Sequence, residues 1–506
     1  MSRVHVGLVG LIVVVFLIGY FEASVIEAVR WVEDLFSGLL QAFLAQPGPE
    51  APDLQATEAA PGKVDQRLHI SYWEKWGSFE ADACQAMVDE FNKRDNEVFV
   101  HYLRTSEVNR KSMLAIIGED PPDVVGLWDF DLEPFAEGGA LMPLDELMAN
   151  SGLTRDYYTP NYLKLCQHDG RTYALPTTPS SVALFYNKEH FRQKASALRA
   201  AGLDPERAPR TIEELDRYAD VLTEFDEAGK PRIMGFLHTE PGWFHSTWGI
   251  YFGGRLYDAA AGKVTTDDPE NVRAFAWAKR YAEKYGREKL LRFRSGFGTF
   301  DSPQNAFIEG KVSMVMHGVW FPNFIRRHRP HMEFAVAPFP CAEGVEGPRS
   351  VLEADIIAIP RGCRHPEAAW KFVRFTQGEG LEILCRLQGK HMPIRKPPTH
   401  FRDGHPNLEL DVFERVAAAP HSTTSPRIMV WREYRSELER AFEHIWSWPV
   451  PEKELRGLTR QERQAKIHEL CRAEVEKTLR EVRERIQGRL DRNRERDALR
   501  PKGEAP

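Results

Sequence analysis

The chain has 506 residues, 42% of them hydrophobic and 28% charged, and a formal net charge of -7 at pH 7. This length allows about two to four domains, and the negative balance gives no reason to expect nucleic-acid binding. Six scattered cysteines without a CxxC pair argue against a disulfide framework and a cysteine zinc site. We expect buried free thiols, with a single bridge between Cys341 and Cys363 as the alternative.

The amino-terminal segment predicts a membrane anchor. Arg3 precedes an apolar run over residues 4–20, which is about the length of a short spanning helix. No small-residue cleavage pattern follows the run, and acidic residues such as Glu22 and Glu27 lie beyond it. By the positive-inside rule, the rest of the chain then lies outside the cytoplasm. We expect an uncleaved anchor; the alternative is a cleaved signal peptide that leaves a soluble periplasmic protein.

Two further segments separate this anchor from the folded body. Residues 21–43 have an amphipathic helical pattern that continues the anchor or lies on the membrane surface. Residues 46–66 are rich in Pro, Ala, Gly and acidic residues and predict a flexible linker. The folded body therefore begins at residue 67.

From residue 67 onward, strands alternate with helices. Apolar strands are predicted at residues 68–73, 98–103 and 123–128, and an amphipathic helix at residues 80–94. This order indicates an α/β sheet whose parallel strands are joined by right-handed crossovers.

A second region follows the turn-rich stretch 176–181. Residues 182–187 and 312–317 predict further strands. Thr211 begins a helix that carries Glu214 at its third position, which is a capping-box arrangement.

Indoles and carboxylates occur together at predicted strand ends. Trp73 is followed directly by Glu74, and Trp128 by Asp129, while Trp320 follows the strand 312–317. Because open α/β sheets hold ligands at the carboxyl ends of their strands, these residues are candidate ligand contacts.

Several motifs occur in an order that resembles one known family. They are Pro122-Asp-Val-Val, Phe135-Ala-Glu-Gly-Gly-Ala-Leu-Met-Pro-Leu144, Leu184-Phe-Tyr-Asn-Lys, Pro209-Arg-Thr-Ile-Glu-Glu-Leu215, Ala306-Phe-Ile-Glu-Gly-Lys-Val, Gly318-Val-Trp320, Asp355-Ile-Ile-Ala-Ile-Pro360 and His365-Pro-Glu-Ala-Ala-Trp370. Over about residues 67–450 the chain resembles the family 1 extracellular solute-binding proteins, the maltose-binding-like sugar receptors of ABC importers.

The resemblance implies an α/β, two-lobe periplasmic binding protein type II fold with hinge crossovers, preceded by the transmembrane helix and followed by a charged helix. The implied domains are the membrane anchor and amphipathic helix at 1–45, the linker at 46–66, lobe 1 at 67–179 and 352–394, lobe 2 at 180–351 and 395–450, a C-terminal helical extension at 451–492 and a disordered tail at 493–506. The stretch 176–181 would be the first hinge segment.

The resemblance also implies a set of ligand-binding residues. They are Trp73, Glu74, Trp128, Asp129, Trp243, Trp248, Trp320 and Trp431. Trp243 and Trp248 compete for one position, because the resemblance is loose between residues 236 and 250. Indole rings cover the C–H faces of a sugar, and carboxylates accept hydrogen bonds from its hydroxyls.

We therefore expect an extracytoplasmic receptor that binds a sugar or oligosaccharide between its lobes, with no catalytic residue, no metal and no cofactor. Its partners would be the sugar-like ligand, the permease subunits of an ABC transporter and, through the N-terminal helix, the membrane, but no nucleic acid.

Three alternatives are open. A secreted glycosidase or lyase could use Glu74 and Asp129 as its paired carboxylates, although no other catalytic motif accompanies them. The same fold could bind an anionic, glycerophosphate-like ligand through Arg171, Arg395 or Arg432. A receptor that signals to a membrane sensor is the third.

The C-terminal extension predicts one long helix. An apolar stripe, formed by Ile467, Cys471, Val475, Leu479, Val482, Ile486 and Leu490, runs through its many Arg and Glu residues. We expect this stripe to pack on the second lobe, with self-association or contact with a transporter subunit as the alternative.

Overall fold

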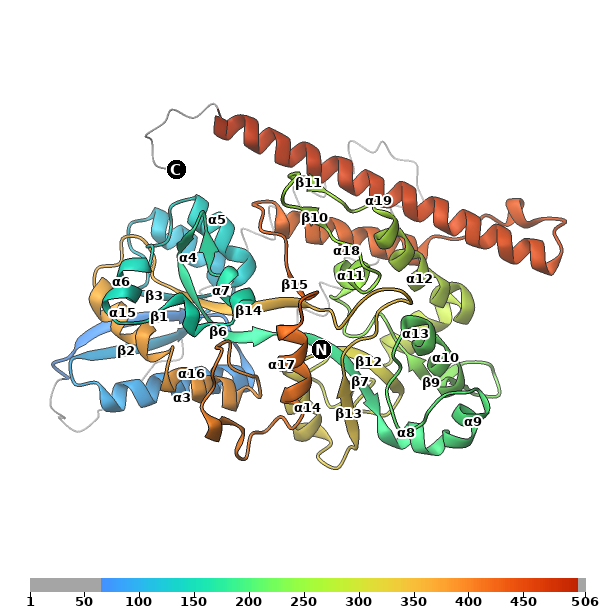
Figure 1. The fold of residues 1–506 in the computed structure, drawn as a ribbon, viewed down its shortest axis with the longest axis horizontal. Coiled ribbons are helices and arrows are strands. Elements are labelled where there is room, and N and C mark those ends of the chain that lie inside the picture. Colours follow the sequence, from blue (N-terminus) through green and yellow to red (C-terminus); the bar gives the residue numbers. More distant parts are fainter. Residues whose placement is uncertain (1–64, 499–506) are drawn as a thin grey trace, which may run out of the picture. The chain divides into compact units, whose positions relative to one another are not determined.

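A computed structural model describes residues 65–498, which form two lobes, each built on one β-sheet (Figure 1). The predicted anchor at 1–45 and nearly all of the predicted linker lie outside the described residues. Among the residues that are described, no helix has the length and hydropathy needed to cross a bilayer.

The first lobe is built on a six-stranded sheet in the order β15-β14-β3-β1-β2, with β6 also paired to β14. Its strands are β1 (Leu68–Glu74), β2 (Val98–Arg104), β3 (Val124–Trp128), β6 (Ala174–Ser180), β14 (Val351–Ala358) and β15 (Thr423–Thr424). Its helices are α3 (Ser78–Arg94), α4 (Val108–Ile117), α5 (Leu132–Glu137), α6 (Asp145–Asn150), α7 (Pro160–Lys164), α15 (Pro366–Phe375) and α16 (Glu379–Leu387), and a small hairpin joins β4 (Gln167–His168) to β5 (Arg171–Thr172). β1 pairs in parallel with β2 and β3, which confirms the predicted arrangement.

The second lobe is built on a five-stranded sheet in the order β13-β7-β12-β9-β8. Its strands are β7 (Val182–Asn187), β8 (Glu224–Phe225), β9 (Pro231–Phe236), β12 (Val312–Gly318) and β13 (Phe334–Ala337), and a separate hairpin pairs β10 (Tyr257–Asp258) with β11 (Lys263–Val264). Its helices are α8 (Lys188–Gln193), α9 (Ala195–Ala200), α10 (Ile212–Leu222), α11 (Trp248–Tyr251), α12 (Pro269–Tyr285), α13 (Arg287–Ser295), α14 (Phe321–His328), α17 (Leu410–Ala418), α18 (Trp431–Ser447) and α19 (Arg460–Ala498). β12 is buried along its whole length, as its apolar sequence predicted.

Local capping follows the sequence at α10. The Glu214 backbone N–H donates to the Thr211 hydroxyl at 3.1 Å, so Thr211 is the N-cap. The Glu214 carboxylate accepts the Arg210 N–H at 2.6 Å. The capping residues are therefore those predicted, although the returning bond reaches Arg210 instead of Thr211.

With α17 in the second lobe and β15 in the sheet of the first, the chain crosses between the lobes at five places. We call three of them the first, second and third crossing: the first is at Ser181, between β6 and β7; the second joins β13 to β14; the third runs from β15 to α18. The chain also passes from α16 to α17 and from α17 to β15. The turn-rich stretch 176–181 is mostly strand β6, which pairs only with β14 among the described strands. Pro176 and Pro179 fit there because an edge strand tolerates residues without an N–H donor.

The C-terminal helix α19 lies along α12 and α18 of the second lobe (Figure 1). Its predicted apolar stripe is buried from Cys471 to Leu490, with Ile467 partly buried. The stripe therefore packs on the second lobe, as expected. The helix continues to Ala498, beyond residue 492 where it was predicted to end.

All six cysteines are free thiols. Cys341 is buried in the core of the second lobe, whereas Cys363 packs against the core of the first. The alternative bridge between them is therefore absent, because the two residues belong to different cores.

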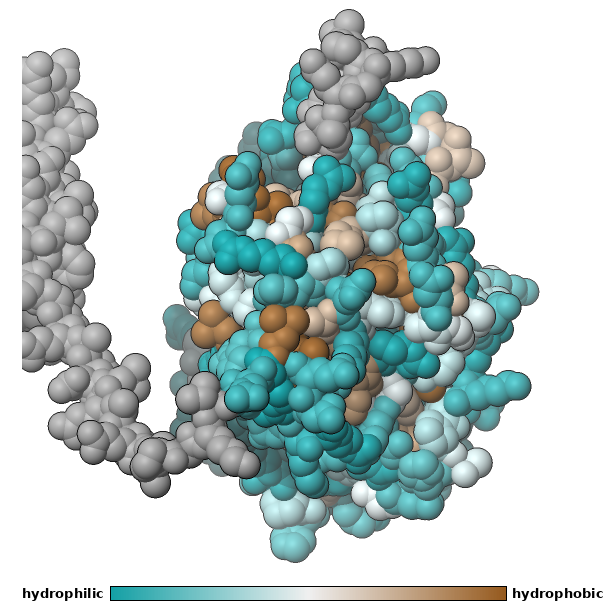
Figure 2. Space-filling view, turned by 90° about the vertical axis from the view of Figure 1, so that its left-hand side faces the viewer, coloured by the Kyte–Doolittle hydropathy of each residue, from teal (hydrophilic) through white to brown (hydrophobic). Residues whose placement is uncertain are grey.

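The outer face of the first lobe is predominantly hydrophilic, with hydrophobic residues in small, separate groups (Figure 2). On this lobe, Leu114 and Ile117 of α4 are exposed, whereas the side chains along β1 and β3 that face the helices are buried. Most of the large apolar side chains of this lobe are thus buried in its core.

Candidate functional site

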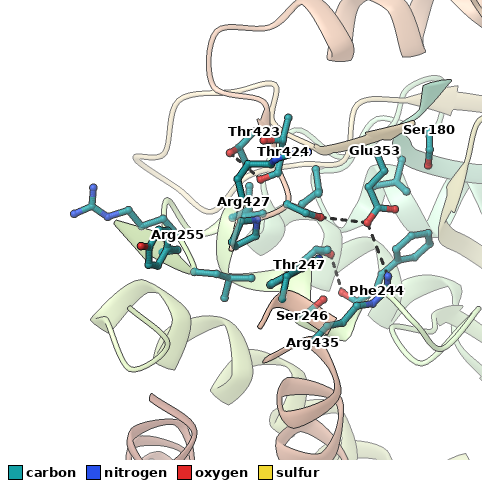
Figure 3. A pocket seen from close by; sticks show the side chains of 18 of the residues that line it. Ser180, Phe244, Ser246, Thr247, Arg255, Glu353, Thr423, Thr424, Arg427 and Arg435 are labelled. Carbon is teal, nitrogen blue, oxygen red and sulfur yellow. Dashed lines mark hydrogen bonds and ion pairs between the residues drawn. The ribbon is translucent and has the colours of Figure 1, made fainter. Parts of the chain in front are cut away.

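A cavity of about 240 Å³ lies where the first, second and third crossings run between the lobes. Ser180 and Val182 come from the first crossing, Val351 and Glu353 from the second, and residues 423–427 from the third. The other lining residues are Lys164 of the first lobe and Trp243, Phe244, Ser246, Thr247, Ile250, Arg255, Leu256, Tyr257, Ala259, Trp431 and Arg435 of the second. We call this space the hinge cavity (Figure 3).

Two indoles line the hinge cavity. Trp431 begins α18 and is 5% exposed; its ring packs edge-on against Tyr434 at 5.6 Å, and its Nε1 has no acceptor among the described residues. Trp243 is half-buried and lies edge-on to Phe300, with 4.9 Å between the ring centres. The cavity thus offers aromatic surface, and the Trp431 N–H is a buried donor without a partner among the described residues.

A carboxylate and a guanidinium face each other across the cavity. Glu353 lies 3.9 Å from Arg435 and accepts a hydrogen bond from the Ser425 hydroxyl at 3.3 Å (Figure 3). Arg435 also donates to Glu439 at 3.2 Å. Arg435 lies one helical turn after Trp431, so α18 directs both side chains to the same side. The pair supplies acceptors and donors beside the indoles.

Asp129 is a buried carboxyl behind this pair. Its Oδ1 accepts the Ala354 backbone N–H at 3.1 Å, and its Oδ2 has no donor among the described residues. Burial, reinforced by the negative charge of Glu353, raises the pKa of Asp129 well above its ordinary value. Burial thus disfavours the charged form of Asp129, whereas the Glu353 side chain lines the cavity.

Arg427 joins the third crossing to the first lobe. Its Nε donates to Glu133 of α5 at 2.7 Å, and its two terminal nitrogens donate to the Leu165 and Gln167 carbonyls at 2.7 and 3.0 Å. Each of its three nitrogens thus donates to a protein group, which makes Arg427 a structural anchor of the cavity wall.

The lobes are in contact on either side of the hinge. Phe79 of α3 packs edge-on against Phe324 of α14, with 5.1 Å between ring centres, and Asn323 donates to the Gln388 carbonyl at 2.6 Å. Elsewhere Arg432 of α18 forms an ion pair with the buried Asp131. These contacts join the two lobes on both sides of the hinge.

Arg432 also covers an aromatic ring of the first lobe. Its guanidinium lies 4.7 Å from the centre of Phe130, which packs against the core of the second lobe. Burial raises the pKa of Asp131, and the charge of Arg432 opposes that rise. The pair therefore links a buried acid of one lobe to a half-exposed base of the other.

A cluster of buried charges lies in the first lobe, around Asp355 of β14. Asp355, two residues after Glu353 on β14, lies 3.2 Å from Lys75 and 3.4 Å from Lys390. Lys75 also pairs with Glu74 at 3.0 Å. Burial alone would lower the pKa of Lys75, but the carboxylates of Asp355 and Glu74 raise it above its ordinary value.

Two indoles cover the ammonium groups of this cluster. Lys75 Nζ lies 4.8 Å from the centre of Trp76 and 5.2 Å from that of Trp128, and Lys390 Nζ lies 5.2 Å from Trp76. Trp128 in turn stacks on Phe130, with 5.7 Å between ring centres. Cation–π contacts and ion pairs therefore hold these charges together at the carboxyl end of β1.

Of the predicted site residues in the first lobe, none lines the hinge cavity. Trp73 packs against the lobe's own core, and Glu74 accepts the Tyr72 hydroxyl at 2.6 Å while pairing with Lys75. Gly126 makes room for Glu74, since a Cβ at that position would lie 1.8 Å from its Oε2. Trp128 and Asp129 lie close to the contact between the lobes, as described above.

The predicted residues of the second lobe divide into two groups. Trp243 and Trp431 line the hinge cavity. Trp248 is 1% exposed inside the core, and Trp320 packs on that core beside His317, at 5.9 Å between ring centres. Gly318 permits this approach because a Cβ there would lie 2.2 Å from the Trp320 ring.

Several residues of the region between the lobes were not predicted. Glu353, Arg427 and Arg435 carry no local motif, and neither Lys390 nor Trp76 is among the residues predicted to bind the ligand. The one usable signal is the spacing of Arg435 four residues after Trp431, which puts both on one face of a helix. The three arginines proposed for an anionic ligand lie apart from the cavity: Arg171 and Arg395 are exposed elsewhere, and Arg432 pairs with Asp131. Within residues 65–498, no group of three or more His, Cys, Asp or Glu side chains is placed to hold a metal ion.

Comparison with known proteins bears on this architecture. The model of the family described as bacterial extracellular solute-binding protein matches residues 79–381. The chain is similar to the maltotriose-binding protein of Pyrococcus abyssi, with 24% identity over 345 residues, 67% of this chain and 68% of that one. It is also similar to the arabinooligosaccharide-binding protein of Bacillus subtilis, with 25% identity over 350 residues, 66% of this chain and 75% of that one.

A solved structure shares the fold. CpMnBP1 with mannobiose bound superposes with a TM-score of 0.65 at 24% identity, covering 81% of this chain and 100% of that one. The family match spans more than half of the chain and includes strands and helices of both lobes. The chain belongs to the bacterial extracellular solute-binding proteins.

Proposed function

We propose that this protein is the extracytoplasmic receptor of an ABC importer and that it holds a short saccharide in the hinge cavity. The observation that carries the proposal is the combination of two indoles, Trp243 and Trp431, with the facing pair Glu353 and Arg435 in one cavity between the lobes. The names of the similar proteins support the ligand class, since they bind maltotriose, arabinooligosaccharides and mannobiose.

The chemistry of the cavity suits a sugar ring. The indole faces can cover its apolar C–H faces, the Glu353 carboxylate can accept hydroxyl hydrogens, and the Trp431 Nε1–H and Arg435 can donate to hydroxyl oxygens. Each hydrogen bond to a charged group contributes about 1.5–3 kcal/mol. The volume of about 240 Å³ favours a short saccharide over a long one.

The charge of the lining also favours a neutral ligand over a glycerophosphate-like anion. Four cationic side chains line the cavity: Arg255, Arg427, Arg435 and Lys164. Of these, Arg427 donates to Glu133 and to two carbonyls, and Arg255 pairs with Asp258 at 2.7 Å. In Figure 3, Arg255 also points away from the other labelled side chains. Arg435 faces Glu353, so a second anion beside it would meet a negative charge.

We further propose that the lobes are those drawn from the sequence, 67–179 with 352–394 and 180–351 with 395–450, except that β15 (Thr423–Thr424) joins the sheet of the first lobe. We also propose that residues 1–45 anchor the protein outside the cytoplasm. Transfer of the ligand to permease subunits completes the proposed role. A catalytic role is not proposed, because Glu74 is bonded to Lys75 and Tyr72 and neither Glu74 nor Asp129 lines the hinge cavity. Intact-mass analysis of the membrane fraction tests the anchor: retention of residue 1 supports it, and a mature chain starting beyond residue 20 contradicts it.

Calorimetric titration of the purified protein tests the ligand class. We expect maltotriose, mannotriose or arabinotriose to bind without being cleaved, as chromatography of the recovered sugar would verify. Trp243→Ala should weaken binding at least tenfold, because it removes an indole from the cavity. Trp448→Ala is the matched control, since that half-buried indole does not line the cavity. No binding of any saccharide, or tight binding of glycerophosphodiesters instead, would overturn the proposal.

A further inference from the structure

One wall of the hinge cavity is a short loop that the C-terminal helix contacts. Arg255, Leu256, Tyr257 and Ala259 line the cavity, and this stretch leads into the β10–β11 hairpin of residues 257–264. We call residues 255–264 the wall hairpin. Its position bears directly on the shape of the cavity.

The wall hairpin has little structure of its own. Only two residue pairs form its ladder, Tyr257 with Val264 and Asp258 with Lys263. An isolated two-stranded hairpin is marginal in water even when it is longer than this. Contacts with the rest of the lobe must therefore hold it in place.

Helix α19 supplies such contacts at both ends of the hairpin loop. Gln487 Oε1 accepts the Val264 backbone N–H at 2.8 Å, and its Nε2 lies 3.4 Å from the Gly262 carbonyl. Arg494 donates to the Gly262 carbonyl and to the Tyr257 hydroxyl, both at 3.1 Å. One of these bonds reaches a side chain that lines the cavity.

The helix is itself a firm support. Its buried stripe, including Val482, Ile486 and Leu490, is part of the core of the second lobe, and so is Val264 of the hairpin. Arg483 adds an ion pair of 2.9 Å with Asp267, just beyond the hairpin. The helix is thus fixed along the length that contacts the wall hairpin.

Helix α18 completes the same support from the cavity side. Tyr434 donates to the Leu256 carbonyl at 2.9 Å and bonds the Thr266 hydroxyl. The helix that carries Trp431 and Arg435 and the helix that carries Gln487 and Arg494 therefore fix the wall hairpin between them.

We infer that α19 sets the ligand affinity of the hinge cavity by holding the wall hairpin, with Gln487 and Arg494 as positioning residues. The inference rests on the proposed function and goes beyond it, because α19 lies outside the region that the family model matches, residues 79–381. Neither side chain lines the cavity, so both act through Tyr257 and the hairpin backbone.

The test uses Gln487→Ala, Arg494→Ala and the double variant in the full chain. Removing the stripe by truncation would expose the core, so point variants are preferred. We expect the double variant to raise the Kd of the best-binding sugar among maltotriose, mannotriose and arabinotriose by about threefold to tenfold, with an unchanged thermal midpoint. Arg494→Lys, which keeps a donor, should restore part of the affinity.

Arg480→Ala is the matched control, because this exposed arginine of the same helix makes no hydrogen bond or ion pair with the described residues. Hydrogen exchange of the amides at 256–264 supplies a readout that needs no ligand, and the double variant should exchange faster there. Unchanged exchange, or a Kd within twofold of the wild type, would overturn the inference. If no sugar binds the wild type, the proposed function fails, while the exchange comparison still decides whether α19 holds the hairpin.

Discussion

Replacement of Asp355 by asparagine tests the buried charges beside the cavity. Asp355 is the carboxylate shared by Lys75 and Lys390, whose side chains are 1% and 3% exposed. It also accepts the Thr178 hydroxyl at 2.5 Å. Asparagine keeps the shape of the side chain but removes its charge, so two buried ammonium groups lose their common partner.

Asp355→Asn should lower the free energy of unfolding substantially, because the charges at this site are buried. Removing one member of a buried ion pair costs about 3–5 kcal/mol, because the remaining charge stays desolvated. Lys75 retains Glu74 at 3.0 Å, whereas the one carboxylate left to Lys390 is Glu80, at 3.9 Å, beside the Thr178 hydroxyl at 3.1 Å. We therefore expect a loss near the lower end, about 3 kcal/mol, out of a total of about 5–15 kcal/mol for a typical protein. Urea unfolding at pH 7, followed by tryptophan fluorescence, measures it.

A second variant separates charge from shape. Asp355→Asn combined with Lys390→Gln removes one charge of each sign, so it should recover a substantial part of the stability lost by Asp355→Asn alone. A loss below about 1 kcal/mol for the single variant, without recovery in the double variant, would refute the description of these lysines as buried and dependent on Asp355.

Three further predictions follow from the same region. Trp431→Phe removes the indole N–H but keeps an aromatic ring. The Kd for the bound sugar should therefore rise about fivefold, which corresponds to about 1 kcal/mol for one hydrogen bond. Titration calorimetry measures the Kd, and an unchanged value would exclude the N–H as a donor. Burial raises the pKa of Glu80 to about 7 from its ordinary 4.5, against the opposing charge of Lys390. Between these pH values the folded state keeps a proton that the unfolded state releases, so the free energy of unfolding should fall as pH rises from 4.5 to about 7. Glu80→Gln should reduce that fall, as urea unfolding at several pH values would show. Parallel curves of unfolding free energy against pH for the wild type and the variant would contradict the prediction. Arg432→Ala breaks the half-exposed ion pair with Asp131, which contributes about 1 kcal/mol after screening. If the pair holds the lobes together, the ratio of closed to open unliganded protein should fall about fivefold. Small-angle scattering would then show a larger radius of gyration, and an unchanged radius would argue against this link.

Much of the fold could be predicted because its signals are local. The strands β1, β2 and β3 follow from short apolar runs, and each lies within one residue of its predicted bounds. The stretch 176–181 was less clear, because its two prolines suggest a turn, yet an edge strand accommodates them. Whether a proline stretch turns or runs along an edge depends on the neighbouring strand, which the local sequence does not specify.

The site could be predicted only in part, because its wall comes from segments far apart in the chain. Trp431 and Trp243 stand out as indoles, but Trp248 has the same local appearance and lies in the core. Glu353 reaches the cavity because β14 crosses between the lobes, and its neighbour Asp355 faces two lysines from other elements. Such placement is a tertiary property, and no spacing along the chain encodes it.

A crystal structure of the protein with the best-binding trisaccharide would locate the ligand directly. We predict a sugar ring between Trp243 and Trp431, with its hydroxyls bonded to Glu353 and Arg435. A saccharide bound at any other surface, with water alone in the hinge cavity, would contradict the assignment of this cavity as the binding site.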